Sequence, residues 1–314
     1  MEISVVILSW NDKRYLEECL GSLSQAPKSR STEIIVVDNA STDGSPELVK
    51  AAFPAVKLIK NPENLGFSNG NNVGIRASAG KYICLLNSDI KVLGGCLDTL
   101  ADYMDHHPDI GMIGPRILNS DMTHQSSCRR FPTLWNNWCE VSALARAFPA
   151  SRLFSGEHMF YFKGDRRAEV DVLVGCFWMV RRAAVDEFGL LDDGFFMFAE
   201  DLDWCKRCWR AGWRVVFLPA AQAIHYRGGS STKKDAVWLA VTQQRSVLRY
   251  WKKHHGVLGW LAMSCLVLVH RSLRGAIALI HYATRPSRRE DSQTRLHVAA
   301  ECLKAVFSRP KRAT

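Results

Sequence analysis

The sequence predicts an α/β fold, a mostly parallel sheet flanked by helices, followed by a helical extension. Short apolar runs alternate with amphipathic stretches of helical length from Met1 to about residue 115, which is typical of parallel strands joined by right-handed helical crossovers. Polar side chains stand directly after two of these runs, where open α/β sheets bind their ligands. Residues 251–314 then change in character and become strongly basic.

The first part of the chain supplies the regular alternation. Each expected strand is a short run rich in β-branched residues, and each expected helix carries its apolar residues on one face. The strands are expected at residues 3–8, 33–37, 56–60 and 81–87, and the helices at 12–24, 45–53 and 67–79.

The second part is less regular. Residues 116–169 show no clear period, and strand character returns at 170–180. A helix is expected at 201–211, a strand at 213–218, a Gly-Gly-Ser loop at 228–232 and a long helix at 235–254. We therefore expect a domain over residues 1–232, in two halves that meet near residue 115, and an extension over 233–314.

The composition is that of an ordinary globular protein, with 47% hydrophobic and 23% charged residues. Nearly all of the net charge of +10 lies in residues 251–314, which contain 12 Lys or Arg against 3 Asp or Glu. A basic partner surface therefore belongs to the C-terminal region.

Ten cysteines show no paired framework, and the apolar start is too short for a secretory signal. Reduced thiols in the cytoplasm are expected. Cys205 and Cys208 are expected to be structural helix residues, because no second pair of zinc ligands stands at a matching spacing.

The apolar residues 257–283 are interrupted by His270, Arg271 and Arg274. An Arg at the bilayer centre costs about 3 kcal/mol on insertion scales. A helix that lies in the membrane surface or dips into it therefore fits this segment better than a full span. The alternative is a helix buried against the main domain with a solvated basic tail.

The most informative polar group follows the strand expected at 81–87. Asn87, Ser88 and Asp89 end an apolar run, and a carboxylate there is a hard ligand suited to Mg²⁺ or Mn²⁺ that also contacts a phosphate. Taken alone, Asp89 is more simply explained as the cap of a turn.

Two earlier segments are also polar. Asp38 and Asn39 emerge at the end of the second strand, where they either bind a base or ribose or only form the turn. Residues 64–74 place glycines four apart, so Gly66 and Gly70 share a helix face that a backbone or a ligand can approach closely. This pattern matches neither the dinucleotide fingerprint nor a phosphate loop. Its asparagines suit a neutral sugar or nucleoside.

Acids directly follow an aromatic run at residues 195–198. Glu200, Asp201 and Asp203 lie where a first helical turn favours acids, but their density exceeds what capping requires. A carboxylate there can accept a proton from an attacking hydroxyl. His225 stands alone after a strand, and a structural and a functional role are equally open for it.

Together these segments resemble an inverting family 2 glycosyltransferase with the GT-A fold, the Rossmann-like fold of nucleotide-diphospho-sugar transferases. The resemblance is closest to the bacterial rhamnosyltransferase-like branch and covers about residues 1–232. It implies a nucleotide-binding half over residues 1–115 and an acceptor half over 116–232.

The resemblance implies roles for individual residues. Asp201 is the expected catalytic base. Asp89 and His225 are the expected ligands of Mg²⁺ or Mn²⁺, since Asn87 stands in place of the first acid of the family's D-x-D motif. The expected contacts to the nucleotide sugar are Ser9, Trp10, Asn11, Asp38, Asn39, Asn64, Gly66, Phe67, Gly70, Asn87, Ser88 and Asp89. The candidates for the acceptor side or a lid are Glu200, Asp203, Arg227 and Trp135.

The implied reaction transfers a sugar, L-rhamnose from a dTDP donor or otherwise a UDP-sugar, to a saccharide hydroxyl in cell-surface polysaccharide synthesis. With the basic, apolar tail it suggests a polyprenyl-diphosphate-linked acceptor and peripheral attachment to the anionic inner face of the cell membrane. One alternative is an inactive GT-A domain that serves as a membrane-bound assembly partner, which should have lost some of Asp89, Asp201 and His225. Nucleic-acid binding ranks last, because the body of the protein is nearly neutral.

Overall fold

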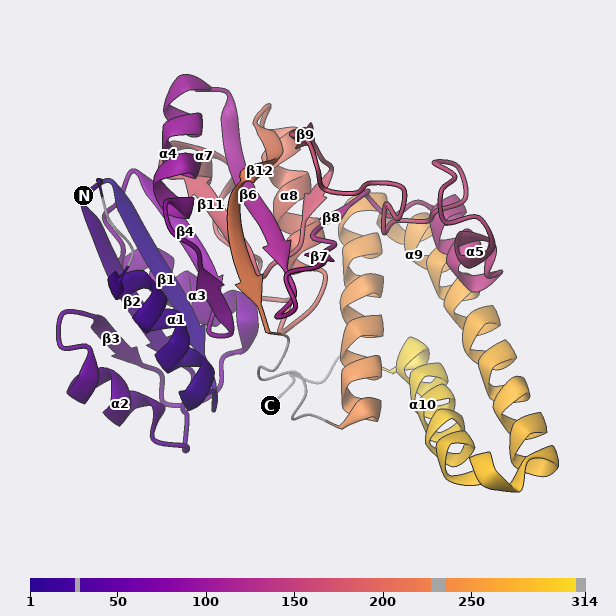
Figure 1. The fold of residues 1–314 in the computed structure, drawn as a ribbon. Coiled ribbons are helices and arrows are strands. Elements are labelled where there is room, and N and C mark those ends of the chain that lie inside the picture. The colour runs from indigo at the N-terminus through magenta and orange to yellow at the C-terminus, as the bar shows by residue number, and fades with distance from the viewer. Residues whose placement is uncertain (26–28, 227–234, 309–314) are drawn as a thin grey trace.

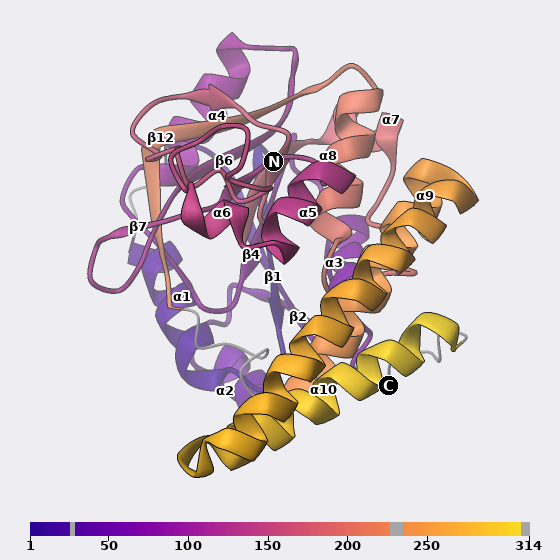
Figure 2. The same ribbon diagram turned by 90° about the vertical axis from the view of Figure 1, so that its right-hand side faces the viewer.

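The computed structural model describes residues 1–25, 29–226 and 235–308. A twisted sheet lies between layers of helices, and a helical arm projects from one side of this body (Figures 1 and 2). The loop expected at 228–232 and the candidate Arg227 lie outside the described residues.

The strands, in chain order, are β1 (Ile3–Ser9), β2 (Thr32–Asp38), β3 (Lys57–Lys60), β4 (Tyr82–Asn87), β5 (Ile90–Val92), β6 (Ile110–Leu118), β7 (His124–Gln125), β8 (Cys128–Arg129), β9 (Ala168–Glu169), β10 (Val172–Leu173), β11 (Phe177–Arg181) and β12 (Arg214–His225). The helices are α1 (Lys13–Gln25), α2 (Ser45–Ala52), α3 (Gly66–Ala77), α4 (Cys96–His106), α5 (Leu134–Val141), α6 (Leu144–Ala147), α7 (Arg182–Phe188), α8 (Glu200–Arg210), α9 (Ala236–Thr284), a 3₁₀ turn (Pro286–Arg288) and α10 (Arg289–Phe307).

The main sheet has the order β3-β2-β1-β4-β11-β6-β12-β5. The first four of these strands are parallel, β11 runs antiparallel between β4 and β6, and β12 is parallel to β6. The expected α/β fold with a mostly parallel sheet is therefore confirmed.

Successive side chains of a strand point to opposite faces of the sheet, and this alternation lets helices pack on both faces. On β1, Ile3, Val5 and Ile7 join the core beneath α1 and α4, whereas Val6 joins the core on the face of α3 and α8. Burying both faces in this way requires the nearly continuous apolar strands seen in the sequence.

The glycines of α3 serve close packing on this sheet. A Cβ on Gly74 would collide with the side chain of Val6, and one on Gly70 would collide with Leu8. Asn72 donates to the Leu191 carbonyl at 2.8 Å and accepts from the Leu191 N–H at 3.0 Å. Asn72 therefore holds the loop that carries Leu191 against α3.

Two strands differ from expectation in ways that shape the site. The strand expected at 170–180 is two strands, β10 and β11, and residues 174–176 between them line a cavity. The strand expected at 213–218 continues to His225, because the chain resumes pairing with β6 after an irregularity between Leu218 and Gln222. Cys205 and Cys208 are fully buried on α8, as expected of structural residues.

The helix expected at 235–254 continues to Thr284 and breaks at Gly256, whose φ is 68°. We call residues 236–255 the first limb of α9 and residues 257–284 its second limb. The first limb buries Leu248, Tyr250 and Trp251 in the core of the body, and α10 packs back along α9. Of the helices in the described residues, α9 is the one long and apolar enough to cross a membrane, and only 17% of its most apolar stretch is buried.

Candidate functional site

A cavity of about 830 Å³ opens at the carboxyl ends of β1, β4 and β12. One wall comes from the loops after β1 and β4, and another comes from the segment that leads into α8. The cavity then continues to both limbs of α9. Its position at the strand ends is where open α/β sheets bind ligands.

Asparagines and one glycine build the first wall. Asn39 donates to Asn64 Oδ1 at 3.2 Å and to the Gly66 carbonyl at 3.1 Å, and it accepts from Asn61 Nδ2 at 2.8 Å. Gly66 has a φ of 78°, and a Cβ there would lie 2.5 Å from the Phe196 carbonyl oxygen. Only glycine fits this position, which joins the first wall to the segment before α8.

Eight of the twelve residues expected to contact the nucleotide sugar line the cavity: Trp10, Asn39, Asn64, Gly66, Phe67, Asn87, Ser88 and Asp89. The other four, Ser9, Asn11, Asp38 and Gly70, do not line it. Asp38 accepts from the Ser41 N–H at 3.2 Å, and Asn11 accepts from the Thr42 N–H at 2.7 Å. These two side chains therefore shape the turn after β2.

Asp89 and His225 lie together because of strand pairing. In the antiparallel β5–β12 pair, His225 is opposite Ile90, and the Tyr226 N–H donates to the Asp89 carbonyl at 3.0 Å. This register brings Nε2 of His225 within 3.3 Å of Oδ1 of Asp89.

Gln125 orients the imidazole of His225. Its Nε2 donates to Asn119 Oδ1 at 2.8 Å, so its Oε1 is the atom 2.7 Å from Nδ1 of His225. Nδ1 of His225 then donates to this oxygen, so Nε2 is the ring nitrogen that faces Asp89. A carboxylate oxygen and an imidazole nitrogen placed 3.3 Å apart can both contact one cation.

The donor set fits Mg²⁺ or Mn²⁺ with ligands from a second molecule. A carboxylate and an imidazole suit these hard or borderline cations better than thiolate-binding metals. Among the described residues, no group of three or more His, Cys, Asp and Glu side chains gathers to hold a metal. The remaining positions around a cation would fall to water or phosphate oxygens, as is usual for Mg²⁺.

Asp201 and Glu200 begin α8 on the opposite wall. The residues before them, Phe198 and Ala199, have φ values of 71° and 61°, an uncommon left-handed pair that turns the chain sharply into the helix. The Ser246 hydroxyl on α9 donates to the Met197 carbonyl at 2.8 Å and supports this turn. Such conformations persist where the surrounding structure holds them, often at functional sites.

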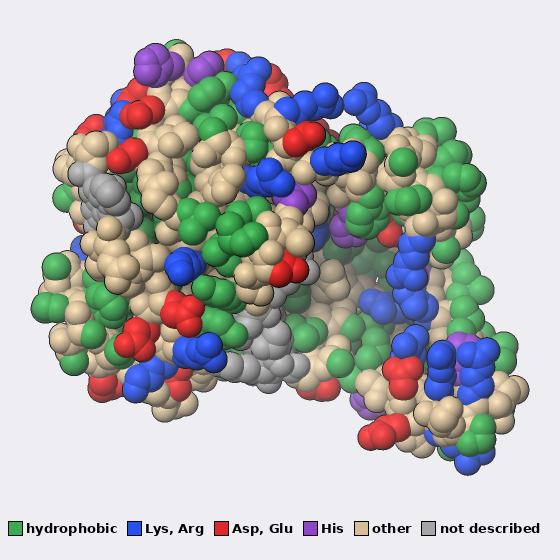
Figure 3. Space-filling view, viewed as in Figure 1, with side chains coloured by type: hydrophobic (Ala, Val, Ile, Leu, Met, Phe, Trp, Pro, Cys, Tyr) green, Lys and Arg blue, Asp and Glu red, His purple; other side chains and the backbone are tan. Residues whose placement is uncertain are grey.

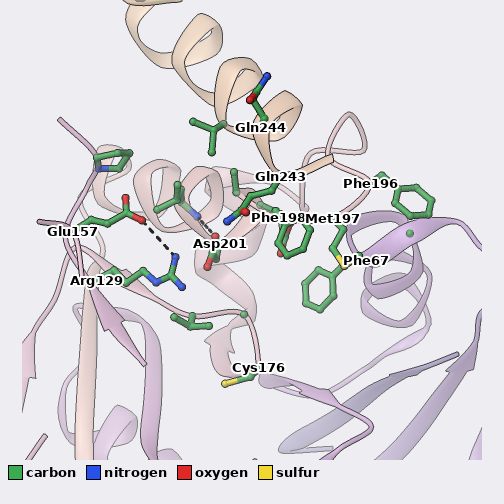
Figure 4. Close-up of a pocket in the computed structure, with 18 of the residues that line it drawn as sticks. Phe67, Arg129, Glu157, Cys176, Phe196, Met197, Phe198, Asp201, Gln243 and Gln244 are labelled. Carbon is green, nitrogen blue, oxygen red and sulfur yellow. Dashed lines mark hydrogen bonds and ion pairs between the residues drawn. The ribbon is translucent and has the colours of Figure 1, made fainter. Parts of the chain in front are cut away.

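Burial makes both acids better proton acceptors than free carboxylates. It raises the pKa of Asp201 above its ordinary range, although Arg129 opposes that shift. Burial and the charge of Asp201 raise the pKa of Glu200 to about 8. Figure 4 shows Arg129 and Gln243 both extending toward Asp201, while Nη1 of Arg129 also lies 3.7 Å from Oε1 of Glu157.

The structure corrects two of the acceptor-side candidates. Asp203 lies outside the cavity with a fully buried side chain, and it accepts from Arg207 Nε at 2.9 Å and from His254 Nε2 at 2.7 Å. It is therefore a structural link between α8 and α9. Trp135 is 46% exposed away from the cavity, and its Nε1 donates to the Leu153 carbonyl at 3.0 Å.

Several cavity residues escaped the sequence analysis. Asp12 is buried and accepts from the Ser88 hydroxyl at 2.9 Å, so it orients the loop that carries Asp89. Gln125, Glu157 and Gln243 arrive from β7, an irregular segment and α9. None of these four residues stands in a local sequence motif.

Comparison with known proteins bears on this site. The sequence model described as Glycosyl transferase family 2 matches residues 4–189. A Mycobacterium tuberculosis (strain ATCC 25618 / H37Rv) protein, N-acetylglucosaminyl-diphospho-decaprenol L-rhamnosyltransferase, is 28% identical over 306 residues, 94% of this chain and 96% of that protein. The dTDP-rhamnosyl transferase RfbF of Shigella flexneri is 23% identical over 259 residues, 82% of this chain and 79% of its own.

Solved structures share the fold. The mannosyltransferase PcManGT from Pyrobaculum calidifontis, in complex with GDP-Man and Mn²⁺, aligns with a TM-score of 0.56 at 16% identity, over 98% of this chain and 87% of its own. S. aureus TarS 1–349 in complex with UDP-GlcNAc aligns with a TM-score of 0.52 at 17% identity, over 96% and 91%. The expected GT-A fold is thereby confirmed.

Proposed function

This chain belongs to glycosyl transferase family 2, and on that premise we propose that it is a metal-dependent, inverting transferase that moves L-rhamnose from dTDP-rhamnose to a lipid-linked saccharide. The observation that carries the proposal is the cavity itself. It holds the Asp89–His225 pair on one wall and the buried acid Asp201 on the other.

The donor is proposed to bind against the first wall. Asn39, Asn64 and Phe67 offer amides and an aromatic ring to a base and ribose, and Trp10 lies beside them on the same wall. Asp89 and His225 would hold Mg²⁺ or Mn²⁺, which as a Lewis acid would offset the charge of the departing diphosphate. The rhamnose donor is inferred from the names of the two relatives.

Asp201 is proposed as the general base. The acceptor hydroxyl gives its proton to the Asp201 carboxylate, and its oxygen bonds to the anomeric carbon. The bond between that carbon and the diphosphate oxygen breaks on the opposite face, which inverts the anomeric centre. The raised pKa supports this role, since a base is more effective as its pKa approaches the working pH.

The acceptor is proposed to be a saccharide on a polyprenyl diphosphate at the inner face of the cell membrane. The mycobacterial relative is named for such an acceptor. The second limb of α9 exposes apolar side chains, among them Leu258 and Ile280, 81% and 59% exposed, within a strongly basic stretch of the chain. An apolar surface beside basic residues is what attachment to anionic lipid requires.

A ligand screen tests the proposal. Thermal shift is measured with dTDP, UDP and GDP, each with and without Mn²⁺. The proposal predicts that dTDP gives the largest stabilisation, that this stabilisation needs Mn²⁺, and that dTDP-rhamnose then supports transfer to a lipid-linked saccharide. Metal-dependent dTDP binding without transfer to any such acceptor would instead favour an inactive assembly partner.

A further inference from the structure

The cavity continues beyond Asp201 into a crevice between the two limbs of α9, and we propose that this crevice binds the lipid diphosphate of the acceptor through Arg271. This inference rests on the proposed function, because it assigns a subsite to that acceptor. It names the side chains that would distinguish a lipid diphosphate from a free saccharide or a neutral lipid.

The break at Gly256 creates the crevice by turning the second limb back beside the first. The residues that line it are Trp238, Gln243, Gln244, Val247, Met263, Leu266, Val267, His270 and Arg271. Figure 3 shows the hollow between the body and the helical arm, with basic side chains on the arm. The crevice and the site of Asp201 are parts of one cavity, so a bound molecule can reach both.

A hydrogen bond to Gln244 orients the guanidinium of Arg271 so that it can bind an anion. Its Nε donates to Gln244 Oε1 at 3.1 Å, and Gln244 Nε2 donates in turn to the Cys302 carbonyl at 2.6 Å. Among the described residues, the hydrogen bond at Nε is the one that fixes the guanidinium, so its two terminal amino groups can contact a ligand. Such a fork matches the oxygens of a phosphate.

Nothing in the described part of the chain neutralises this charge. No carboxylate there lies within ion-pair distance of Arg271, in contrast to Arg249 and Lys253 on the first limb, which both pair with Asp192. The α9 residues that line the crevice include no acid. A half-buried, unneutralised cation in a cavity favours an anionic ligand.

The rest of the crevice is apolar. Val247, Met263, Leu266 and Val267 supply its walls, and Leu258 and Leu261 continue the apolar character on the exposed surface of the second limb. A free saccharide does not need these walls, and a neutral lipid does not need Arg271. A diphosphate joined to a hydrocarbon chain uses both.

Binding of farnesyl diphosphate to the full chain tests this inference. The detergent-solubilised protein is first saturated with dTDP and Mn²⁺, so that a second diphosphate cannot occupy the nucleotide site. Farnesyl diphosphate, farnesol and pyrophosphate are then titrated against wild type, Arg271→Gln, Arg271→Lys and Arg274→Gln. Arg274 is the matched control, because it is an exposed cation on the same limb and does not line the cavity.

Wild type is expected to bind farnesyl diphosphate more tightly than either farnesol or pyrophosphate. Arg271→Gln should weaken that binding about tenfold, as the loss of a charge-assisted hydrogen bond does, and Arg271→Lys should restore part of it. Arg274→Gln and the dTDP thermal shift of all variants should stay unchanged.

Three results would overturn the inference: equal affinity of Arg271→Gln and wild type, pyrophosphate binding as tightly as farnesyl diphosphate, or a parallel loss of dTDP binding in Arg271→Gln. The last would show a structural role only. The proposed function fails separately, if farnesyl diphosphate binds as expected but no nucleotide sugar supports transfer.

Discussion

Nε2 of His225 lies 3.3 Å from Oδ1 of Asp89, across the antiparallel pairing of β12 with β5. The hydrogen bond from Nδ1 of His225 to Gln125 Oε1 turns the imidazole so that Nε2 faces the carboxylate. Strand pairing thereby brings together two side chains far apart in the chain, and we propose that they bind one cation.

Replacing Asp89 or His225, the two proposed metal ligands, is expected to weaken metal-dependent nucleotide binding. Asp89→Asn and His225→Ala should each weaken Mn²⁺-dependent dTDP binding by at least about tenfold, and Gln125→Leu should have a smaller effect of the same sign. Isothermal titration with dTDP at several Mn²⁺ concentrations measures this. Asp186→Asn, an exposed acid on α7, is the control. Unchanged Mn²⁺ dependence in Asp89→Asn would rule out this pair as the metal site.

The pH dependence of transfer should report Asp201. Its pKa is raised by burial and lowered by Arg129. Transfer needs the ionised carboxylate, so kcat/KM should fall as the pH drops through that raised pKa. Arg129→Gln removes the lowering influence, and its acid limb should therefore lie at higher pH than that of wild type.

The neighbouring Arg130→Gln is the matched control for this shift. Arg130 is exposed and donates to the Arg152 carbonyl at 2.8 Å, away from Asp201. An acid limb that stays in place in Arg129→Gln would show that Asp201 is not the group that titrates.

The buried Asp203 should matter for stability and not for the chemical step. Arg207, Lys253 and His254 surround its carboxylate and hold its pKa well below the usual range, against the effect of burial. A depressed pKa stabilises the folded state above the unfolded-state pKa, and this stability is lost as the pH falls through the folded-state value. The free energy of unfolding of Asp203→Asn should therefore be about 3 kcal/mol lower than that of wild type at neutral pH.

Urea unfolding at neutral and acidic pH measures this difference, with Asp186→Asn as the control. The difference in the free energy of unfolding between Asp203→Asn and wild type should be smaller at acidic pH than at neutral pH. A loss of kcat in well-folded Asp203→Asn, with stability unchanged, would return Asp203 to the list of candidate bases.

Attachment to lipid should depend on the exposed face of the second limb. The double variant Leu258→Ser, Ile280→Ser should lower partitioning onto anionic vesicles at least tenfold, since each side chain contributes roughly 1.5–3 kcal/mol when buried in an apolar phase. Added salt should weaken the binding of wild type as well. Co-sedimentation measures both effects.

Met122→Ser is the control, because Met122 is 54% exposed on the turn before β7. Point variants are preferable to truncation near Tyr250, because Tyr250, Trp251 and Met263 belong to the core of the body. Wild-type partitioning by the double variant would contradict attachment through this limb.

The sequence predicted the strands of the first half of the sheet and their approximate ends, because these depend on local patterns of apolar and polar residues. The strand before Asp89 ends at Asn87 as expected, β2 ends at Asp38, one residue later than expected, and α8 begins one residue before its expected start. The helix-face pattern of α3 was ambiguous: glycines four apart allow either a ligand or a sheet to approach, and at Gly70 it is the sheet.

What the sequence could not supply is the set of contacts made by tertiary packing. Asp12 accepts from Ser88, Gln125 orients His225, and Gln244 accepts from Arg271, in each case between segments that share no sequence motif. Asp203 is a further example. In the sequence it stands in the same acid-rich turn as Asp201, but in the structure His254 of α9 covers it.

The most direct test of the account is the anomeric configuration of the product. Wild type and Asp201→Asn are incubated with dTDP-rhamnose, Mn²⁺ and a polyprenyl-diphosphate-linked saccharide, and the new glycosidic bond is assigned by NMR. We expect wild type to form a rhamnoside of configuration opposite to that of the donor, and Asp201→Asn to lose this product while dTDP binding persists. A product that keeps the donor configuration, or one formed equally well by Asp201→Asn, would contradict this expectation.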